Sequence, residues 1–114
     1  MTICIITLLW AIAAVETGHD DSAIGQAGER SQYQIMAATW RQHEPTLPHT
    51  ECRGEAAETV ARSHLLWLVS RLGTDPLTLA SAWNQGLTGH RRKGPNDYAA
   101  RVAALYRDKQ PTLD

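Results

Sequence analysis

The sequence contains no phenylalanine, only two cysteines and almost no excess of charge of either sign. Eleven Lys and Arg stand against twelve Asp and Glu, so the formal net charge is -1 and no overall field attracts nucleic acid. Cys4 and Cys52 are too few for a disulfide scaffold, and the sequence leaves open whether they pair. Without phenylalanine, the core must be built from aliphatic side chains and the four tryptophans. The nearly neutral charge argues against a DNA-binding module.

The composition is that of one folded domain covering residues 1–114. Hydrophobic residues make up 43% of the chain and charged residues 20%, which is the balance of an ordinary globular protein. The apolar run over residues 1–15 has no Lys or Arg before it and is shorter than the roughly 20 residues of a membrane-spanning helix. We therefore interpret this run as a buried helix and expect no stable membrane insertion.

Apolar spacing and helix stop signals predict an all-α fold with one irregular insert. The expected helices cover residues 3–15, 34–43, 54–72 and 76–86, and a last helix is opened by Pro95. Small and polar residues over 18–30 predict a loop or short hairpin after the first helix, and residues 90–94 a basic loop. The first helix is apolar on nearly every side, so we expect it to run through the centre of the molecule.

Glu16 is the candidate catalytic residue, because it follows a helix that contains almost no other polar side chain. Partial burial raises the pKa of a carboxyl group, and a protonated glutamic acid can act as a general acid near neutral pH. The alternative from spacing alone is an exposed glutamate at a helix end.

Three motifs resemble those of soluble lytic transglycosylases and goose-type lysozymes. In that family a catalytic Glu followed by Ser ends a helix, and an A-x-S-x-x-G-A-x-G-L-M-Q-x-x-P-x-T segment comes next. Residues 15–18 and 23–39 align with these features without a gap. Residues 79–86 resemble the A-Y-N-x-G motif, and residues 98–102 resemble the final Y-V-x-x-V helix. The motifs occur in the family's order over nearly the whole chain.

The resemblance implies a lysozyme-like domain that cleaves the β-1,4 bond between N-acetylmuramic acid and N-acetylglucosamine in peptidoglycan. Glu16 matches the catalytic acid, and in lytic transglycosylases one such Glu gives 1,6-anhydro products with help from the substrate's N-acetyl group. The implied substrate-binding residues line a groove formed by the end of the first helix, the insert and the A-Y-N-x-G helix: Thr17, Glu29, Tyr33, Gln34, Trp83, Asn84 and Tyr98.

Departures from the family pattern bear on substrate detail. Thr17 keeps the hydroxyl of the usual Ser, Gly25 replaces a Ser, and Trp83 replaces the Tyr of the A-Y-N-x-G motif. Gln32 replaces a Leu, Ala37 a Pro and Ser31 a Gly. The Ser31 change is the most serious, because a glycine often marks a close approach of backbone to ligand.

A second carboxylate opposite Glu16 would favour hydrolysis over 1,6-anhydro formation. Glu29, Asp20 and Asp21 lie in the insert, although solvated loop charge is the simpler interpretation of all three. The basic residues 90–93 are either solvated or a contact for anionic peptide stems.

Other side chains carry weaker signals. His43, His49 and Cys52 lack the spacing of a zinc site, so we expect no metal and no other cofactor. His64 reads as a core histidine, and Trp10, Trp40 and Trp67 as packing residues.

We therefore predict a monomeric, peptidoglycan-cleaving muramidase located outside the cytoplasm, with lytic transglycosylase chemistry ahead of hydrolysis. The alternative class is a non-catalytic lysozyme-like module that binds glycan or protein. An open groove where Glu16, Asn84 and Tyr98 converge favours the enzyme, and a groove plugged by Gln32 or Trp83 favours the binder. Endo or exo cutting is left open.

Overall fold

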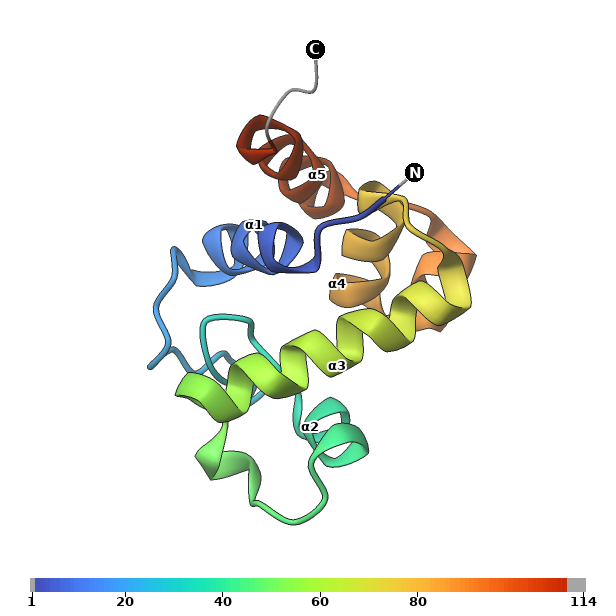
Figure 1. Cartoon of the computed structure of the whole chain (residues 1–114). Coiled ribbons are helices and arrows are strands. Elements are labelled where there is room, and N and C mark those ends of the chain that lie inside the picture. Colours follow the sequence, from blue (N-terminus) through green and yellow to red (C-terminus); the bar gives the residue numbers. More distant parts are fainter. Residues whose placement is uncertain (1, 111–114) are drawn as a thin grey trace.

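A computed structural model describes residues 2–110 and is all-α, as expected, with no strand in this range. Its elements are α1 (Ile5–Thr17), α2 (Ala37–His43), the short 3-10 helix η1 (His49–Glu51), α3 (Gly54–Leu72), α4 (Pro76–Lys93) and α5 (Asp97–Lys109). In Figure 1, α1 lies between α5 and α3, and the segment that joins α1 to α2 runs beside the first turns of α3. The arrangement is compatible with a lysozyme-like fold.

The core is centred on α1, as its apolar sequence predicts. Leu8 and Ile12 have no exposed surface, and neighbouring apolar side chains of α3, α4 and α5 pack in the same cluster. Trp40 is also fully buried and its Nε1 donates a 2.8 Å hydrogen bond to the carbonyl of Leu47. The expected packing role is confirmed for Trp40.

Trp10 does not fit that expectation, because 37% of its surface is exposed. It lines a shallow surface pocket together with Ile6, which is 65% exposed. The Nζ of Lys109 lies 4.5 Å from the centre of the Trp10 ring, and the His19 ring lies 5.2 Å away. Trp10 is therefore a surface residue held between a cation and an imidazole, and α1 is not buried on all sides.

The end of α1 differs from the expected boundary in a way that matters for function. The helix continues past Val15 to Thr17, so Glu16 belongs to its last turn. Gly18 then takes the left-handed conformation (φ 65°), and its N–H and that of His19 bond the carbonyls of Ala14 and Ala13. A glycine suits this position because it has no Cβ penalty at positive φ. The cap gives Glu16 a fixed helical backbone.

Two other predicted boundaries are wrong. Residues 34–36 precede α2 rather than belong to it, because Gln34 has a left-handed φ of 54°. Residues 90–93 form the last turn of α4, where their positive charges suit the helix dipole, and are not a loop.

Gly86 interrupts α4 without ending it. Its backbone is non-helical (φ 76°, ψ 168°), yet the helix resumes and runs to Lys93. Side-chain bonds fasten the second segment to the first: His90 Nδ1 lies 2.8 Å from Ser81 Oγ, and Gln85 Nε2 donates to the carbonyl of Gly94 over 2.9 Å. The predicted break is therefore present, but tertiary contacts keep the chain helical beyond it.

The insert between α1 and α2 is irregular, as expected, and its chain reverses twice. Isolated antiparallel bridges join Ile24 to Arg30 and Arg30 to Ile35. Asp21 Oδ2 accepts a 2.6 Å bond from the N–H of Gly54, which anchors the insert at the start of α3.

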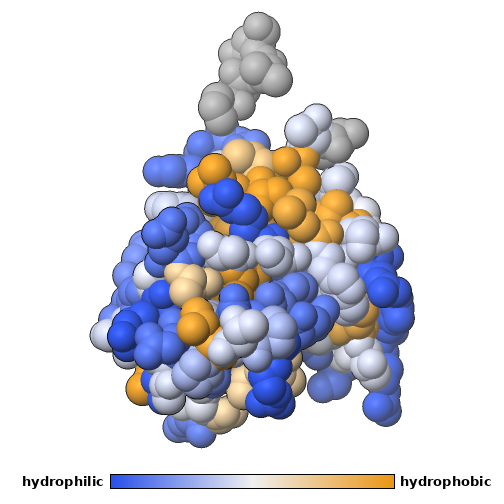
Figure 2. Space-filling model, turned by 60° about the horizontal axis from the view of Figure 1, so that its bottom comes forward, coloured by the Kyte–Doolittle hydropathy of each residue, from blue (hydrophilic) through white to orange (hydrophobic). Residues whose placement is uncertain are grey.

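The surface is mainly polar. In Figure 2, hydrophilic side chains cover most of the visible face, and apolar side chains gather mainly in one patch near the upper edge. Within residues 2–110, no helix combines the length and apolarity needed to cross a membrane. Cys4 and Cys52 are both free thiols.

Candidate active site

Glu16 and Tyr98 meet between the end of α1 and the start of α5. The Tyr98 hydroxyl donates a 2.8 Å hydrogen bond to Oε2 of Glu16. Burial raises the pKa of Glu16, the bond from Tyr98 acts in the opposite direction, and the charge of Glu29 raises the pKa further. Burial and the Glu16 carboxylate raise the pKa of Tyr98 far above its usual range, so Tyr98 stays a donor. The pair therefore holds a carboxyl group that keeps its proton to a higher pH than a free glutamate.

Glu29 is the charged side chain that acts on Glu16 from the insert. It is half-buried, and its Oε1 accepts a 2.9 Å bond from the N–H of Ala27. The carboxylate lies over Gly25, where a Cβ would collide with it. Glu29 is thus a partly exposed carboxylate held by its own turn, and its charge acts on Glu16.

Asn84 approaches the same region from α4. Its side chain is exposed, and its Oδ1 accepts a 2.8 Å bond from Nδ2 of Asn96. Asn96 caps α5 by accepting from the N–H of Ala99 over 3.0 Å, and Tyr98 stands two residues beyond it. Asn84 is therefore tied to the helix start that positions the Glu16 partner.

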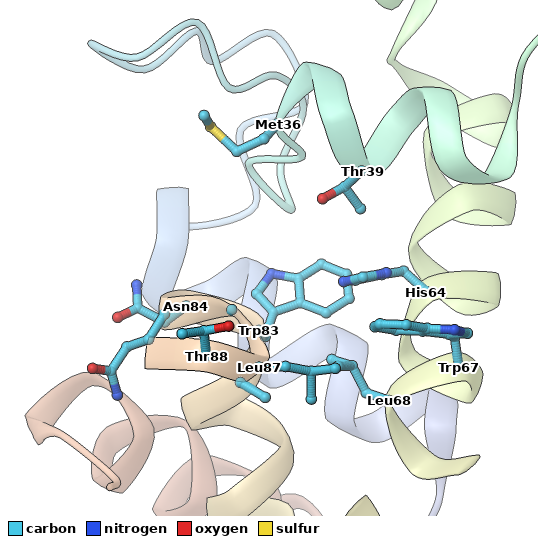
Figure 3. Close-up of a pocket in the computed structure, with 12 residues that line it drawn as sticks. Met36, Thr39, His64, Trp67, Leu68, Trp83, Asn84, Leu87 and Thr88 are labelled. Carbon is cyan, nitrogen blue, oxygen red and sulfur yellow. The ribbon is translucent and has the colours of Figure 1, made fainter. Parts of the chain in front are cut away.

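A cavity of about 430 Å³ extends from Asn84 between α2, α3 and α4. Figure 3 shows the Trp83 indole at its centre, with His64 and Trp67 on one side and Met36 and Thr39 across the opening. Trp83 Nε1 donates a 3.3 Å bond to the carbonyl of Tyr33, which fixes the ring against the insert. Trp83 and Asn84 line this cavity, whereas Glu16, Tyr98 and Gln32 do not.

Comparison with protein families matches residues 6–105 to the Transglycosylase SLT domain. The chain belongs to this family. The members are lytic transglycosylases, and the family-level activity is cleavage of peptidoglycan. The resemblance read from the motifs is confirmed, whereas a search of curated proteins gives no match.

Three of the predicted substrate-binding residues have side chains that contact other parts of this SLT domain. Thr17 Oγ1 donates to the carbonyl of Gln32 over 3.0 Å and so ties α1 to the insert. Gln34 Nε2 donates to the carbonyls of Ser31 and Ala23 at 2.8 and 3.3 Å. Tyr33 is 6% exposed and packs in the core, so its side chain offers almost no surface to a ligand. Their contact with substrate stays a prediction, and their visible role is to hold the site together.

Ser31 has a left-handed backbone, which glycine adopts without a steric penalty. Its φ is 75°, it is 1% exposed, and its Oγ accepts a 3.1 Å bond from the N–H of Tyr33. Position 31 of this SLT domain therefore holds a strained but hydrogen-bonded serine in the left-handed region.

The cavity wall also contains residues that the sequence predicts to be packing residues. His64 stacks on Trp67 with 5.5 Å between ring centres, and His43 Nε2 lies 3.0 Å from His64 Nδ1. The half-buried His64 and Trp67 thus combine packing with a place in the cavity wall, while Met36 and Thr39 had no signal beyond their motif positions. Within residues 2–110, no group of three or more His, Cys, Asp or Glu could hold a metal ion.

Proposed function

We propose that this SLT domain is a lytic transglycosylase that cleaves the bond between N-acetylmuramic acid and N-acetylglucosamine, with Glu16 as general acid and base. The observation that carries the proposal is the half-buried Glu16 carboxyl group, which has a raised pKa and a hydrogen bond to Tyr98. A glutamic acid in this state can donate a proton near neutral pH.

The reaction requires one carboxyl group in two roles. Glu16 gives its proton to the glycosidic oxygen, and the C1–O bond breaks with its electron pair going to that oxygen. The N-acetyl oxygen of the muramic acid supports C1 during this step. The Glu16 carboxylate then takes the proton of the C6 hydroxyl while O6 bonds to C1, which gives the 1,6-anhydro product and restores the acid.

The cavity beside Asn84 is the proposed location of part of the glycan strand. A sugar offers one apolar ring face and several hydroxyl groups, and the Trp83 ring with Asn84 and Thr88 offers an aromatic surface and polar side chains. This substrate places the working enzyme outside the cytoplasm, and we propose that it acts as a monomer without membrane insertion.

Hydrolysis is the second candidate, because the Glu29 carboxylate lies near enough to Glu16 to raise its pKa. A water activated by a second carboxylate would give reducing-end products instead of 1,6-anhydro products. The two chemistries therefore differ in a measurable product.

The test is mass spectrometry of the soluble fragments that the protein releases from purified peptidoglycan. We expect fragments ending in 1,6-anhydromuramic acid from the wild-type protein and none from Glu16→Gln. Glu55→Gln, which neutralises an exposed carboxylate on α3, is the matched control and should retain activity. Glycan binding without any release by the wild-type protein would overturn the proposal in favour of a non-catalytic module.

A further inference from the structure

Gly25 and Glu29 share one space at the tip of the insert. A Cβ on Gly25 would collide with the Oε1, Cδ and Cγ atoms of Glu29, so the Glu29 side chain occupies the place where a residue 25 side chain would begin. The motif that this segment matches has Ser at position 25 and Ala at position 29. Compared with the motif, this chain lacks the serine side chain at position 25, and the carboxylate of Glu29 occupies that space instead.

Local backbone bonds fix this exchange. The N–H of Gly25 donates to the carbonyl of Glu29 over 2.8 Å, and the N–H of Gly28 donates to the carbonyl of Gly25 over 3.0 Å, so the chain folds back on itself. The Ala27 N–H then holds the Glu29 carboxylate at 2.9 Å. Gly25 is not among the residues with positive φ, so its backbone suits any L residue. What glycine provides at position 25 is therefore room for the Glu29 side chain.

The insert that holds this carboxylate is bonded to the end of α1, where Glu16 lies. The charge of the carboxylate raises the pKa of Glu16, which places it within electrostatic reach of the group that donates the proton. The Thr17 hydroxyl bonds the carbonyl of Gln32, so the helix end that carries Glu16 and the insert that carries Glu29 are fastened to each other. A sugar bound at Glu16 would therefore lie next to the insert, in which the Glu29 carboxylate is already held by the Ala27 N–H.

Bond cleavage creates a positive charge that such an anion can stabilise. When the leaving oxygen takes the proton of Glu16 and the electron pair of the C1–O bond, the remaining sugar carries one positive charge shared between C1 and the ring oxygen. A carboxylate fixed beforehand stabilises this state more than the neutral ground state and so lowers the barrier.

We propose that Glu29 is a second catalytic carboxylate, which contacts the reacting sugar as an anion and stabilises the charge that develops on it, and that Gly25 is the positioning residue that makes room for it. The inference rests on the proposed function, because this charge arises only in that reaction.

A double-mutant cycle between positions 25 and 29 tests the proposal on soluble glycan strands. We expect Glu29→Gln to lower kcat about 10- to 100-fold, with KM changed by less than about threefold. Gly25→Ala should lower kcat to a similar extent, because its methyl group displaces the carboxylate. In a Glu29→Ala background, Gly25→Ala should cost nothing further. If the losses in kcat from the changes at positions 25 and 29 multiply in the double variant, the coupling between the two residues is overturned. Full activity of Glu29→Gln would overturn the catalytic role of Glu29.

Two further readouts separate the outcomes. Products of the wild-type protein and of Glu29→Gln should both carry 1,6-anhydro ends. If instead the wild-type protein gives reducing ends and Glu29→Gln gives 1,6-anhydro ends, Glu29 activates water, and the charge-stabilising role is overturned. If only this inference fails, Glu29→Gln matches the wild type while Glu16→Gln is inactive. If the proposed function fails, the wild-type protein releases no fragments and both proposals are overturned. Should Gly25→Ala not fold, Glu29→Gln still decides the catalytic role.

Discussion

The Tyr98 hydroxyl, on α5, donates a 2.8 Å hydrogen bond to the Glu16 carboxylate at the end of α1, across 82 positions of sequence. The bond stabilises the ionised form of Glu16, while burial and the Glu29 charge stabilise the protonated form. Three neighbours thus set the pH range in which Glu16 can donate a proton.

The first prediction is that Tyr98→Phe moves the alkaline limb of the pH profile of kcat/KM to higher pH. Loss of the donor raises the pKa of Glu16, so the acid stays protonated further into the alkaline range. Glu29→Gln should move the same limb to lower pH, because it removes a negative charge that raises the pKa of Glu16. Shifts of the two variants in the same direction would contradict this account.

The second prediction concerns stability in mild acid. Burial lowers the pKa of His64 to about 4, below its usual value of 6.5, and the charge of His43 acts in the same direction. Between those pH values the unfolded chain binds a proton that the folded protein does not, so stability falls as the pH drops from about 6.5 to about 4. The contribution is at most about 3 kcal/mol.

Urea unfolding at a series of pH values measures this effect. His64→Leu should flatten the fall in the free energy of unfolding over that range. His19→Asn is the control, because His19 is exposed and asparagine tolerates its left-handed backbone (φ 69°). Equal slopes for His64→Leu and the wild type would contradict the prediction.

The third prediction is that Ser31 tolerates glycine but not a β-branched residue. Ser31→Val forces a branched side chain into a buried position with φ 75° and removes the acceptor of the Tyr33 N–H, so we expect a loss of about 3 kcal/mol or more. Ser31→Gly relieves the strain and loses the same acceptor, and the net change should be within about 1 kcal/mol. The midpoint of chemical unfolding reports both values, and equal losses would argue against a backbone origin.

The fourth prediction concerns glycan affinity and separates two tryptophans of the cavity wall. Trp83→Leu should weaken binding of a glycan fragment to the Glu16→Gln protein by up to about tenfold, because an aromatic surface is lost. Trp67→Leu should change affinity much less, since the Trp67 ring stacks on His64 and has the Arg71 guanidinium 5.1 Å from its centre. Isothermal titration calorimetry can compare the two, and a larger loss for Trp67→Leu would argue against Trp83 as the sugar-binding surface.

Local signals were sufficient for most of the fold. The helix over 54–72 was predicted to the residue, because its apolar spacing runs unbroken until Gly73. The start of α4 at Pro76 also matches the prediction, and Asp75 caps it with a carboxylate that accepts from the N–H of Thr78. Beyond Gly86 the local signal failed, since bonds from His90 and Gln85 to earlier or later parts of the chain keep that segment helical.

In the candidate site, too, some features could be predicted from the sequence and others depend on tertiary contacts. Glu16 could be predicted as the candidate acid from its place in the family motif, because spacing alone left an exposed glutamate as the alternative. The internal roles of Thr17 and Tyr33 could not, because they depend on which carbonyl or side chain of the insert lies nearby in three dimensions. The position of Glu29 over Gly25 also depends on a side chain that folds back across a turn.

The Gly25 and Glu29 arrangement changes how divergent relatives of this chain should be compared. An aligned column records which residue occupies a position, but it does not record which side chain occupies the corresponding point in space. By columns, this chain has lost a hydroxyl at 25 and acquired an unrelated acid at 29, yet in space the acid stands where the hydroxyl-bearing side chain would begin. Sequences with a glycine at the first position and a carboxylate four residues later should therefore be scored as one paired replacement rather than as two independent departures.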